Sequence, residues 1–456
     1  MSELSEDTAL RRFLLGLAEG MLAADDGVDR VGDTMREVSR AYGHDEVDFF
    51  VLPTLTLVET GGGDTPKLGF RTSSRAKLRF DQIAALYELI ARAKQAAIDP
   101  RDGIDRLNEI GAMKLERHWG WRVFGHALLT TGLALLLAPT WQGALLAFGL
   151  GAVLGFAKLI RSPTLQLVFP VVAAFVSALA VFLLAPAIEV GDPIRLMIAP
   201  LATFLPGGVL TTAVMELAAG QMVSGASRLV TGLVTLGLLS FGIIAAGTII
   251  GVGSSSYVPL VTTESFPWWA APFGLVFFAV GNYLHFAAPA RTFWWVFLVI
   301  LVAYVGQTIG GWIFGQSLSG FIGGFVIAPV VLWIASLKHG APSQLTFLPA
   351  FWLLVPGAAG LVGLTEAIQS PNGATEDFAA ALVSVMSIAI GVLVGTAGYR
   401  FVEHGAEEVS NFHVDVPALH ETERPPLWAR LLPGTPRSFW RRPHGELPPS
   451  SEADGT

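Results

Sequence analysis

The sequence contains no cysteine, and this absence excludes several kinds of chemistry. Without a thiol the chain can form no disulfide, no thiolate metal site and no cysteine nucleophile. The acids and the histidine near the N-terminus stand at no recognised metal-ligand spacing; they are Asp25, Asp26, His44, Asp45 and Glu46. We interpret them as solvated loop residues, and we expect no metal ion and no cofactor.

Charge is scarce over most of the chain. The 456 residues are 52% hydrophobic and only 14% charged, which is too apolar for an ordinary soluble protein. Residues 123–399 hold six basic and seven acidic side chains, a density typical of a polytopic membrane domain. The net charge of -8 comes mostly from the flanking regions.

Signals for nucleic acids, nucleotides and secretion are also missing. The chain has no basic footprint, so we expect no nucleic-acid partner. The glycine-rich stretch "ETGGGDT" (59–65) lacks the Gly-Lys-Ser/Thr of a phosphate loop, which leaves nucleotide-driven transport without support. Charged residues interrupt the first twenty positions, which therefore do not form a signal peptide. We expect the N-terminus to stay in the cytosol.

Residues 1–117 are predicted to form a small cytosolic α+β domain. Leu10, Phe13, Leu14, Leu17 and Met21 follow helical spacing. Further helices are expected over 28–42, 80–97 and 99–114, the last with a proline near its first turn. The stretch "VLPTLTLVE" (51–59) predicts one half-buried strand, in which Leu55 and Leu57 on the apolar face alternate with Thr54 and Thr56. The stretch "KLGFR" (67–71) is its expected partner across a glycine-rich turn.

Ten apolar segments follow, most of them near the roughly 20 residues that cross a bilayer. They lie near 121–139, 141–158, 166–188, 195–218, 227–250, 267–286, 290–308, 312–336, 345–365 and 378–399. If the N-terminus is inside, the cytosolic connections hold Lys158, Arg161, Arg228, Arg291, Lys338 and Arg400, whereas the outer loops hold only Arg195. This asymmetry predicts ten spans with both termini in the cytosol. The proline-rich tail 401–456 is expected to be disordered and could touch membrane lipid.

An internal repeat divides the membrane region into 118–251 and 266–400. Pro206 and Pro356 are 150 residues apart, and the same offset separates five further pairs: Gly207 and Gly357, Glu216 and Glu366, Gln166 and Gln316, Trp119 and Trp269, and Phe175-Val176 and Phe325-Val326. Each half would hold five spans. Because five is odd, the second half enters from the opposite side, which predicts two inverted five-helix repeats of the kind found in many secondary transporters.

The two Pro-Gly pairs predict broken helices inside the membrane. Proline removes a backbone donor, and glycine weakens a helix interior. A break leaves the N-terminus of a half-helix at mid-depth, where its free N–H groups and positive dipole end suit a carboxylate. A proline kink packed against a neighbouring helix is the structural alternative. The break predicts a substrate site at Pro206, Gly207, Gly208, Thr211, Thr212, Pro356, Gly357, Gln166 and Gln316.

Glu216 and Glu366 lie ten residues beyond the two prolines. Acids inside membranes usually mark ion or substrate pathways, so we expect these two to carry protons. An interfacial carboxylate in water is the alternative. His126 and His285 are further candidates, but neither has a partner at the repeat offset.

Three stretches resemble one family. They are "GMLAADDGVDRVGDTMREVSRAYG" (20–43), "VLPTLTLV" (51–58) and "FLPGGVLTTAVMELAAGQMVSGASRLVTG" (204–232). These words are similar to those of the threonine/serine exporters, over roughly residues 8–400. The resemblance implies a cytosolic domain before ten spans, and export of threonine and serine driven by the proton motive force.

The combined prediction is a secondary exporter of small hydroxy amino acids in the cytoplasmic membrane of a bacterium, and not an enzyme. Its expected partners are threonine or serine, protons and membrane lipid, with a homo-oligomer as one assembly that the sequence allows. Three alternatives stay open: export of another small carboxylate such as a dicarboxylate, a membrane-anchored enzyme with its site in 1–117, and a channel.

Overall fold

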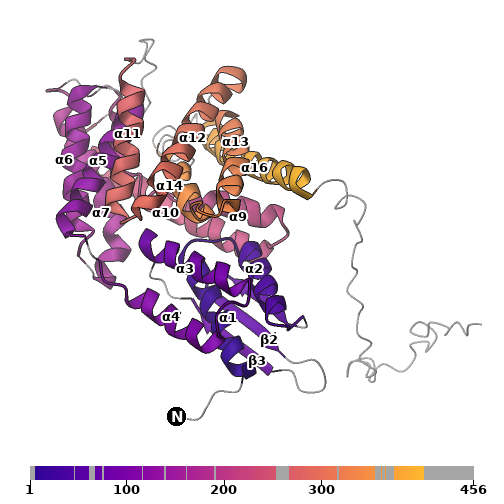
Figure 1. Ribbon diagram of the computed structural model, residues 1–456. Helices are drawn as coiled ribbons and strands as arrows, with labels where there is room; N and C mark the ends of the chain where they lie inside the picture. Colours follow the sequence, from indigo (N-terminus) through magenta and orange to yellow (C-terminus); the bar gives the residue numbers. More distant parts are fainter. Residues whose placement is uncertain are drawn as a thin grey trace, which may run out of the picture. The chain divides into compact units, whose positions relative to one another are not determined.

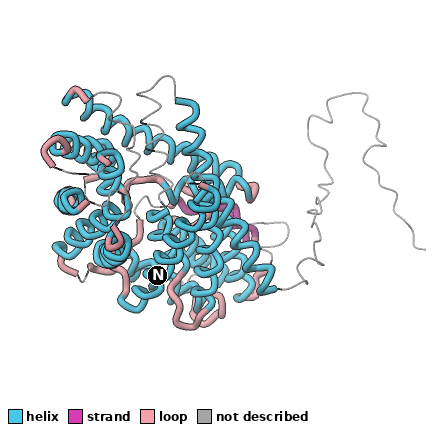
Figure 2. The backbone as a smooth tube through the Cα atoms, turned by 90° about the horizontal axis from the view of Figure 1, so that it is seen from above, coloured by secondary structure: helices cyan, strands magenta, loops and turns pink. Residues whose placement is uncertain are grey.

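The computed structural model describes residues 6–45, 47–60, 67–73, 77–115, 117–137, 140–160, 162–188, 190, 192–252, 267–315, 318–354, 361, 365 and 374–404. These residues are mostly helical, and the strands are confined to one small patch (Figure 2). By compactness, Met1–Glu403 form one unit and His404–Thr456 a second. The tail predicted from 401 onward lies almost entirely outside the described residues.

The N-terminal region contains four helices and three strands. In chain order they are α1 (Glu6–Ala23), α2 (Val28–Ala41), β1 (Asp48–Leu52), β2 (Leu55–Thr60), β3 (Lys67–Thr72), α3 (Phe80–Ala93) and α4 (Pro100–Ala112). The helical spacing of α1 is confirmed, because Phe13, Leu17 and Met21 are fully buried in its core. The start of α4 is also confirmed. Pro100 occupies the first turn, and the Asp99 side chain accepts a hydrogen bond from the Arg101 amide.

The sheet differs from the prediction in two ways. The stretch predicted as one strand is a hairpin, in which Leu52 pairs with Leu55 across a two-residue turn. The sheet therefore has three antiparallel strands in the order β1-β2-β3. The buried face of β2 is also the opposite one, since Thr56 and Val58 are buried and Leu55 and Leu57 only half-buried. A one-residue shift in the alternation exchanges the two faces of a strand.

Apolar helices make up the rest of the described chain. They are α5 (Trp119–Leu137), α6 (Trp141–Ala157), α7 (Pro163–Leu184), α8 (Pro193–Leu201), α9 (Gly207–Ala218), α10 (Met222–Ile250), α11 (Ala270–His285), α12 (Phe293–Phe314), α13 (Ser319–Ser336), α14 (Ser343–Leu354) and α16 (Ala374–His404), with the short 3-10 helix η2 (Ala290–Thr292) before α12.

Length and composition separate these helices into two sets. Five stretches are long and apolar enough to cross a membrane: Trp119–Leu137, Met222–Ile250, Ala290–Phe314, Ser319–Ser336 and Leu382–Val402. Five shorter apolar helices accompany them: Trp141–Ala157, Val168–Leu184, Gly207–Ala218, Ala270–His285 and Ser343–Leu354. The chain therefore has the helices of a membrane protein, and the count of ten spans stays a prediction.

Helices α5 and α11 lie side by side in an antiparallel crossing lined by glycine (Figure 1). A Cβ on Gly132 would overlap the Phe278 backbone nitrogen, and one on Gly281 would overlap that of Leu129. A Cβ on Gly125 would lie 3.0 Å from the Gly281 carbonyl oxygen, and one on Gly274 3.0 Å from the Gly132 carbonyl oxygen. The contacts are thus reciprocal. Small residues allow two membrane helices this close approach.

Candidate functional site

The fourth apolar segment is broken where Pro206 and Gly207 predict a break. Helix α8 ends at Leu201, and α9 begins at Gly207 with Pro206 as its N-cap residue. Proline offers no side-chain acceptor, and no side chain of the N-cap residue caps the helix start. The backbone N–H groups of the first turn of α9 therefore lack the usual N-cap partner.

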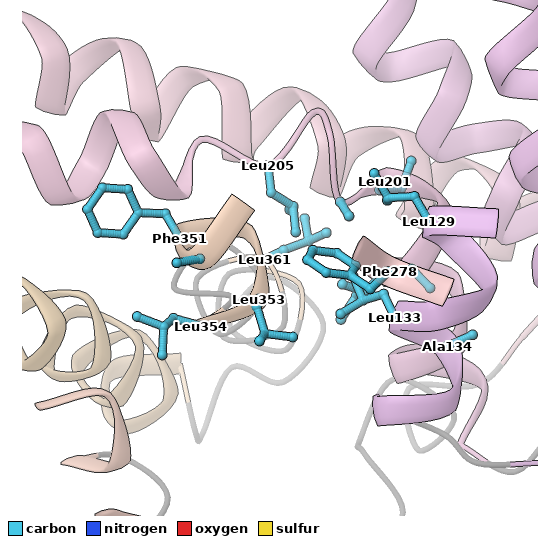
Figure 3. Packing of buried hydrophobic residues seen from close by; sticks show 14 of the residues in the cluster. Leu129, Leu133, Ala134, Leu201, Leu205, Phe278, Phe351, Leu353, Leu354 and Leu361 are labelled. Carbon is cyan, nitrogen blue, oxygen red and sulfur yellow. The ribbon is translucent and has the colours of Figure 1, made fainter. Parts of the chain in front are cut away.

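The start of α9 packs against α14. Phe351 of α14 is the nearest neighbour of Gly208, at 3.9 Å from an ideal Cβ. Leu205 and Leu361 belong to the same buried apolar cluster and lie near each other in Figure 3. Phe351 and Leu361 flank the second Pro-Gly pair along the chain. The first break is therefore close to residues on either side of the second Pro-Gly pair, which itself lies outside the described residues.

The other expected site residues are placed as follows. Thr211 is fully buried, with no hydrogen-bond partner for its hydroxyl, and Thr212 is half-buried. Gln166 lies in α7, but its side chain is outside the described residues, as are Pro356, Gly357, Gln316 and Glu366. Whether these groups meet at one site stays a prediction.

A polar cluster beside the break was not assigned to the site from the sequence. Thr203 lies in the connection between α8 and α9, and its hydroxyl accepts a hydrogen bond from the Lys158 ammonium. The ammonium also lies 3.2 Å from His126 Nε2 and 4.2 Å from the centre of the Phe204 ring. Lys158, expected only as a charge in a cytosolic connection, thus turns inward to the broken span.

The hydrogen bonds of His126 fix its neutral form. Its Nδ1 lies 2.8 Å from the Gly151 carbonyl oxygen, so Nδ1 carries the proton and Nε2 accepts from Lys158 and Thr203. Glycine makes room for the ring, since a Cβ on Gly155 would lie 2.8 Å from the His126 Cβ.

A second histidine joins the cluster from α11. The His285 ring centre is 4.7 Å from that of His126, and His285 Nδ1 bonds the Arg122 carbonyl oxygen at 2.9 Å. One pattern in the sequence could have suggested this group: the two histidines lie in the first helices of the two halves, where Phe124-Gly125 recurs as Phe273-Gly274 at an offset of 149.

Glu216 lies at the end of α9 in a buried ion pair. Its side chain is 1% exposed, and its Oε1 is 3.1 Å from Nε of Arg228 at the start of α10. The same oxygen accepts a hydrogen bond from the Val28 amide at 3.0 Å. The alternative of a carboxylate in water is therefore wrong for Glu216. Its partners are an arginine and the backbone of the N-terminal region.

The turn between α1 and α2 is buried against the apolar helices. Asp26 is 1% exposed, so its interpretation as a solvated residue is wrong. Its Oδ2 accepts a 2.5 Å hydrogen bond from Tyr87, and its backbone oxygen accepts one from Arg228 at 2.8 Å. Arg30 Nη1 lies 3.5 Å from Oδ1. Burial raises the pKa of Asp26, although Arg30 and Tyr87 partly offset this.

The same turn also contacts α14 of the second half. Arg30 Nη2 donates to the Ser343 hydroxyl at 2.5 Å, and Gln344 Nε2 donates to the Ala24 carbonyl oxygen at 2.9 Å. The Phe80 amide at the start of α3 donates to the Phe286 carbonyl oxygen between α11 and α12 at 3.2 Å. The N-terminal region therefore forms hydrogen bonds with three parts of the apolar helices. These are the α9–α10 junction, the α11–α12 connection and the start of α14.

Metal binding has no support in the part of the chain that the structure describes, which holds no group of three or more His, Asp or Glu side chains able to ligate an ion. The apolar helices, the broken α8–α9 segment and the polar cluster beside it define a polytopic helical membrane protein.

A comparison with known protein families places the chain in one family of this class. Residues 12–250 match the family described as "Putative threonine/serine exporter". The match covers more than half of the chain and ends at the last residue of α10. The chain therefore belongs to this family, and the resemblance is confirmed. Neither the curated proteins nor the solved structures contain a match to this chain.

Proposed function

We propose that the protein is a secondary exporter of threonine and serine driven by the proton motive force. The observation that carries the proposal is the break between α8 and α9, in a chain that belongs to an exporter family. A half-helix start inside the bilayer supplies free N–H groups and the positive dipole end. These groups suit the carboxylate of an amino acid, as in other transporters with discontinuous helices.

Two inverted five-helix repeats are part of the proposal. The reciprocal contacts of Gly132 with Phe278 and of Gly281 with Leu129 support them, because each contact is the image of the other at an offset of 149. An isologous interface has this property: residue i contacts j, and the equivalent of j contacts the equivalent of i. The antiparallel direction of the crossing agrees with an axis in the membrane plane.

We propose that the N-terminal region faces the cytosol of a bacterium and that both termini lie there. Its contacts support this orientation. They involve Arg228, the α11–α12 connection with Arg291, and Ser343, five residues after Lys338. These are three of the connections that the positive-inside rule assigns to the cytosol. A folded polar domain can contact all three only if they are on one side.

Glu216 and Glu366 are proposed to carry the protons. The ionised form of Glu216 accepts the Val28 amide and pairs with Arg228. A proton on this carboxyl removes the negative charge that pairs with Arg228. It also weakens the hydrogen bond that Glu216 accepts from the Val28 amide, and so the contact with the α1–α2 turn. Proton release to the cytosol would therefore restore the contact between Glu216 and that turn. This links the proton to closure of the cytosolic side.

Counterflow into proteoliposomes tests the substrate. Purified protein would be reconstituted with unlabelled threonine inside and a panel of labelled compounds outside. We expect accumulation of labelled threonine and serine, and none of labelled succinate. Accumulation of succinate alone would identify a dicarboxylate exporter, and fast equilibration without counterflow would identify a channel. If none of the panel moves, an enzyme with its site in 1–117 becomes the better hypothesis.

A further inference from the structure

The Lys158 ammonium carries a charge that the described residues do not neutralise. Its partners are the His126 imidazole, the Thr203 hydroxyl and the Phe204 ring. None of the ion pairs among the described residues includes Lys158. A lysine at the end of a membrane helix ordinarily extends toward the headgroups, whereas this one turns to the broken span.

The carboxylates of the broken span are bonded elsewhere. Glu216 pairs with Arg228. Asp192 precedes α8, where it accepts hydrogen bonds from the amides of Ile194 and Arg195. Among the described residues, the other ionisable groups beside Lys158 are His126, His285 and Arg122, and none of these is an acid. Within that part of the chain the cluster therefore lacks an anion, and a partly buried cation is stabilised by one.

The position of the cluster matches the proposed route. Thr203, which the Lys158 ammonium contacts, lies three residues before Pro206, the N-cap residue of α9. Both the ammonium and the start of α9 attract negative charge. A zwitterionic amino acid has one anionic group, its carboxylate.

We propose that Lys158 and Thr203 form the subsite that binds the carboxylate of the transported amino acid. The carboxylate accepts a hydrogen bond from the Lys158 ammonium in place of His126 Nε2, and the Thr203 hydroxyl turns its proton from His126 Nε2 to the carboxylate. The inference rests on the proposed function, because it assigns a role in the same export. It predicts that binding requires the carboxylate of the substrate, and that other residues contact the substrate's side chain.

The test pairs a ligand change with a protein change. Threoninol keeps the ammonium and hydroxyl groups of threonine and replaces the carboxylate by an alcohol. Binding of labelled threonine to the full-length purified protein would be measured in competition with unlabelled threonine or threoninol. The parent should prefer threonine by about 10- to 100-fold, the value of a charge-assisted hydrogen bond. The Lys158→Met variant should lose this preference, because its affinity for threonine should fall while its affinity for threoninol stays nearly unchanged.

Lys338→Met is the matched control. Lys338 also ends a predicted span, but its side chain is exposed, so this variant should keep the parent preference. A folded Lys158→Met variant that still prefers threonine by the parent factor would overturn the inference and leave the exporter function intact. A parent that binds neither threonine nor serine would instead overturn the proposed function, and the inference with it.

A second measurement needs no variant. Threonine, but not threoninol, should protect Lys158 of the parent from an amine-reactive reagent, as read by peptide mass spectrometry, while Lys338 is labelled equally with both ligands. Equal labelling of Lys158 with and without threonine, at threonine concentrations that saturate binding, would contradict the subsite.

Discussion

Glu216 and Arg228 form a buried ion pair across the α9–α10 connection, with 3.1 Å between Oε1 and Nε and side chains that are 1% and 10% exposed. Val28 donates its amide to the same carboxylate oxygen. One carboxylate therefore joins the broken span, the next helix and the N-terminal region. Its neutralisation or removal affects all three.

Removal of one partner of this pair should destabilise the protein strongly. Arg228→Met leaves a buried carboxylate, and Glu216→Met leaves a nearly buried guanidinium, so each should cost about 3–5 kcal/mol of stability. The double variant should cost less than the sum of the two, because neither charge is then left alone. Thermal unfolding of the parent, the two single variants and the double variant, each purified in detergent, measures this double-mutant cycle.

An exposed pair nearby provides the control for this cycle. Lys77 and Asp25 are 2.7 Å apart, with side chains 69% and 30% exposed, so Lys77→Met should cost less than about 1 kcal/mol. Equal losses for Arg228→Met and Lys77→Met would show that the buried pair does not hold the N-terminal region in place.

The stability of the protein should depend on pH through Asp26. Burial raises its pKa in the folded state, so the folded protein binds this proton more tightly than the unfolded chain. The stabilisation is fully present below the unfolded pKa near 3.8 and is lost as pH rises through the folded pKa. Asn at this position keeps an acceptor for Tyr87 and cannot lose a proton.

Asp26→Asn should therefore gain stability over the parent as pH rises from about 4 to about 7. Unfolding temperatures of both proteins, compared at each pH, isolate this group because the other groups titrate in both. A difference that stays constant over the range would show that Asp26 is not the titrating group.

Larger side chains at the α5–α11 crossing should destabilise the protein on both sides of the proposed axis. Gly132→Ala and Gly281→Ala each place a Cβ against a backbone nitrogen of the other helix, which should cost about 1–3 kcal/mol. Gly149→Ala is the control, because nothing lies within 4 Å of its added Cβ. Loss of stability in only one of the two crossing variants would argue against equivalent roles in an inverted repeat.

The sequence predicted the features that depend on local chemistry. The spacing of Phe13 and Leu17 predicted the buried face of α1, because the helical repeat places both on one side. Pro206-Gly207 predicted the end of one helix and the start of another, because proline cannot continue a helix without losing a backbone hydrogen bond. The hairpin at Pro53 was missed. Its two-residue turn sits inside an apolar run that alternates like one strand.

Features that depend on contacts distant in sequence could not be predicted. Lys158 was interpreted from its position at the end of a span, whereas its direction depends on His126 of α5 and Thr203 after α8. Asp26 was interpreted as solvated because nothing local shows that Arg228 of α10 would bond its backbone. When a distant part of the chain buries a residue, the sequence around that residue shows no periodic pattern that would indicate the burial.

Threonine efflux across an imposed pH gradient tests the central claim most directly. Proteoliposomes would be loaded with labelled threonine, and the outside made acidic at the start of the measurement. Proton-driven export predicts that the gradient accelerates efflux from vesicles containing the parent protein, that a protonophore abolishes the acceleration, and that Glu216→Gln and Glu366→Gln each lack it. Efflux at the same rate with and without the gradient would contradict proton coupling, and full acceleration in both glutamine variants would assign the coupling to other residues.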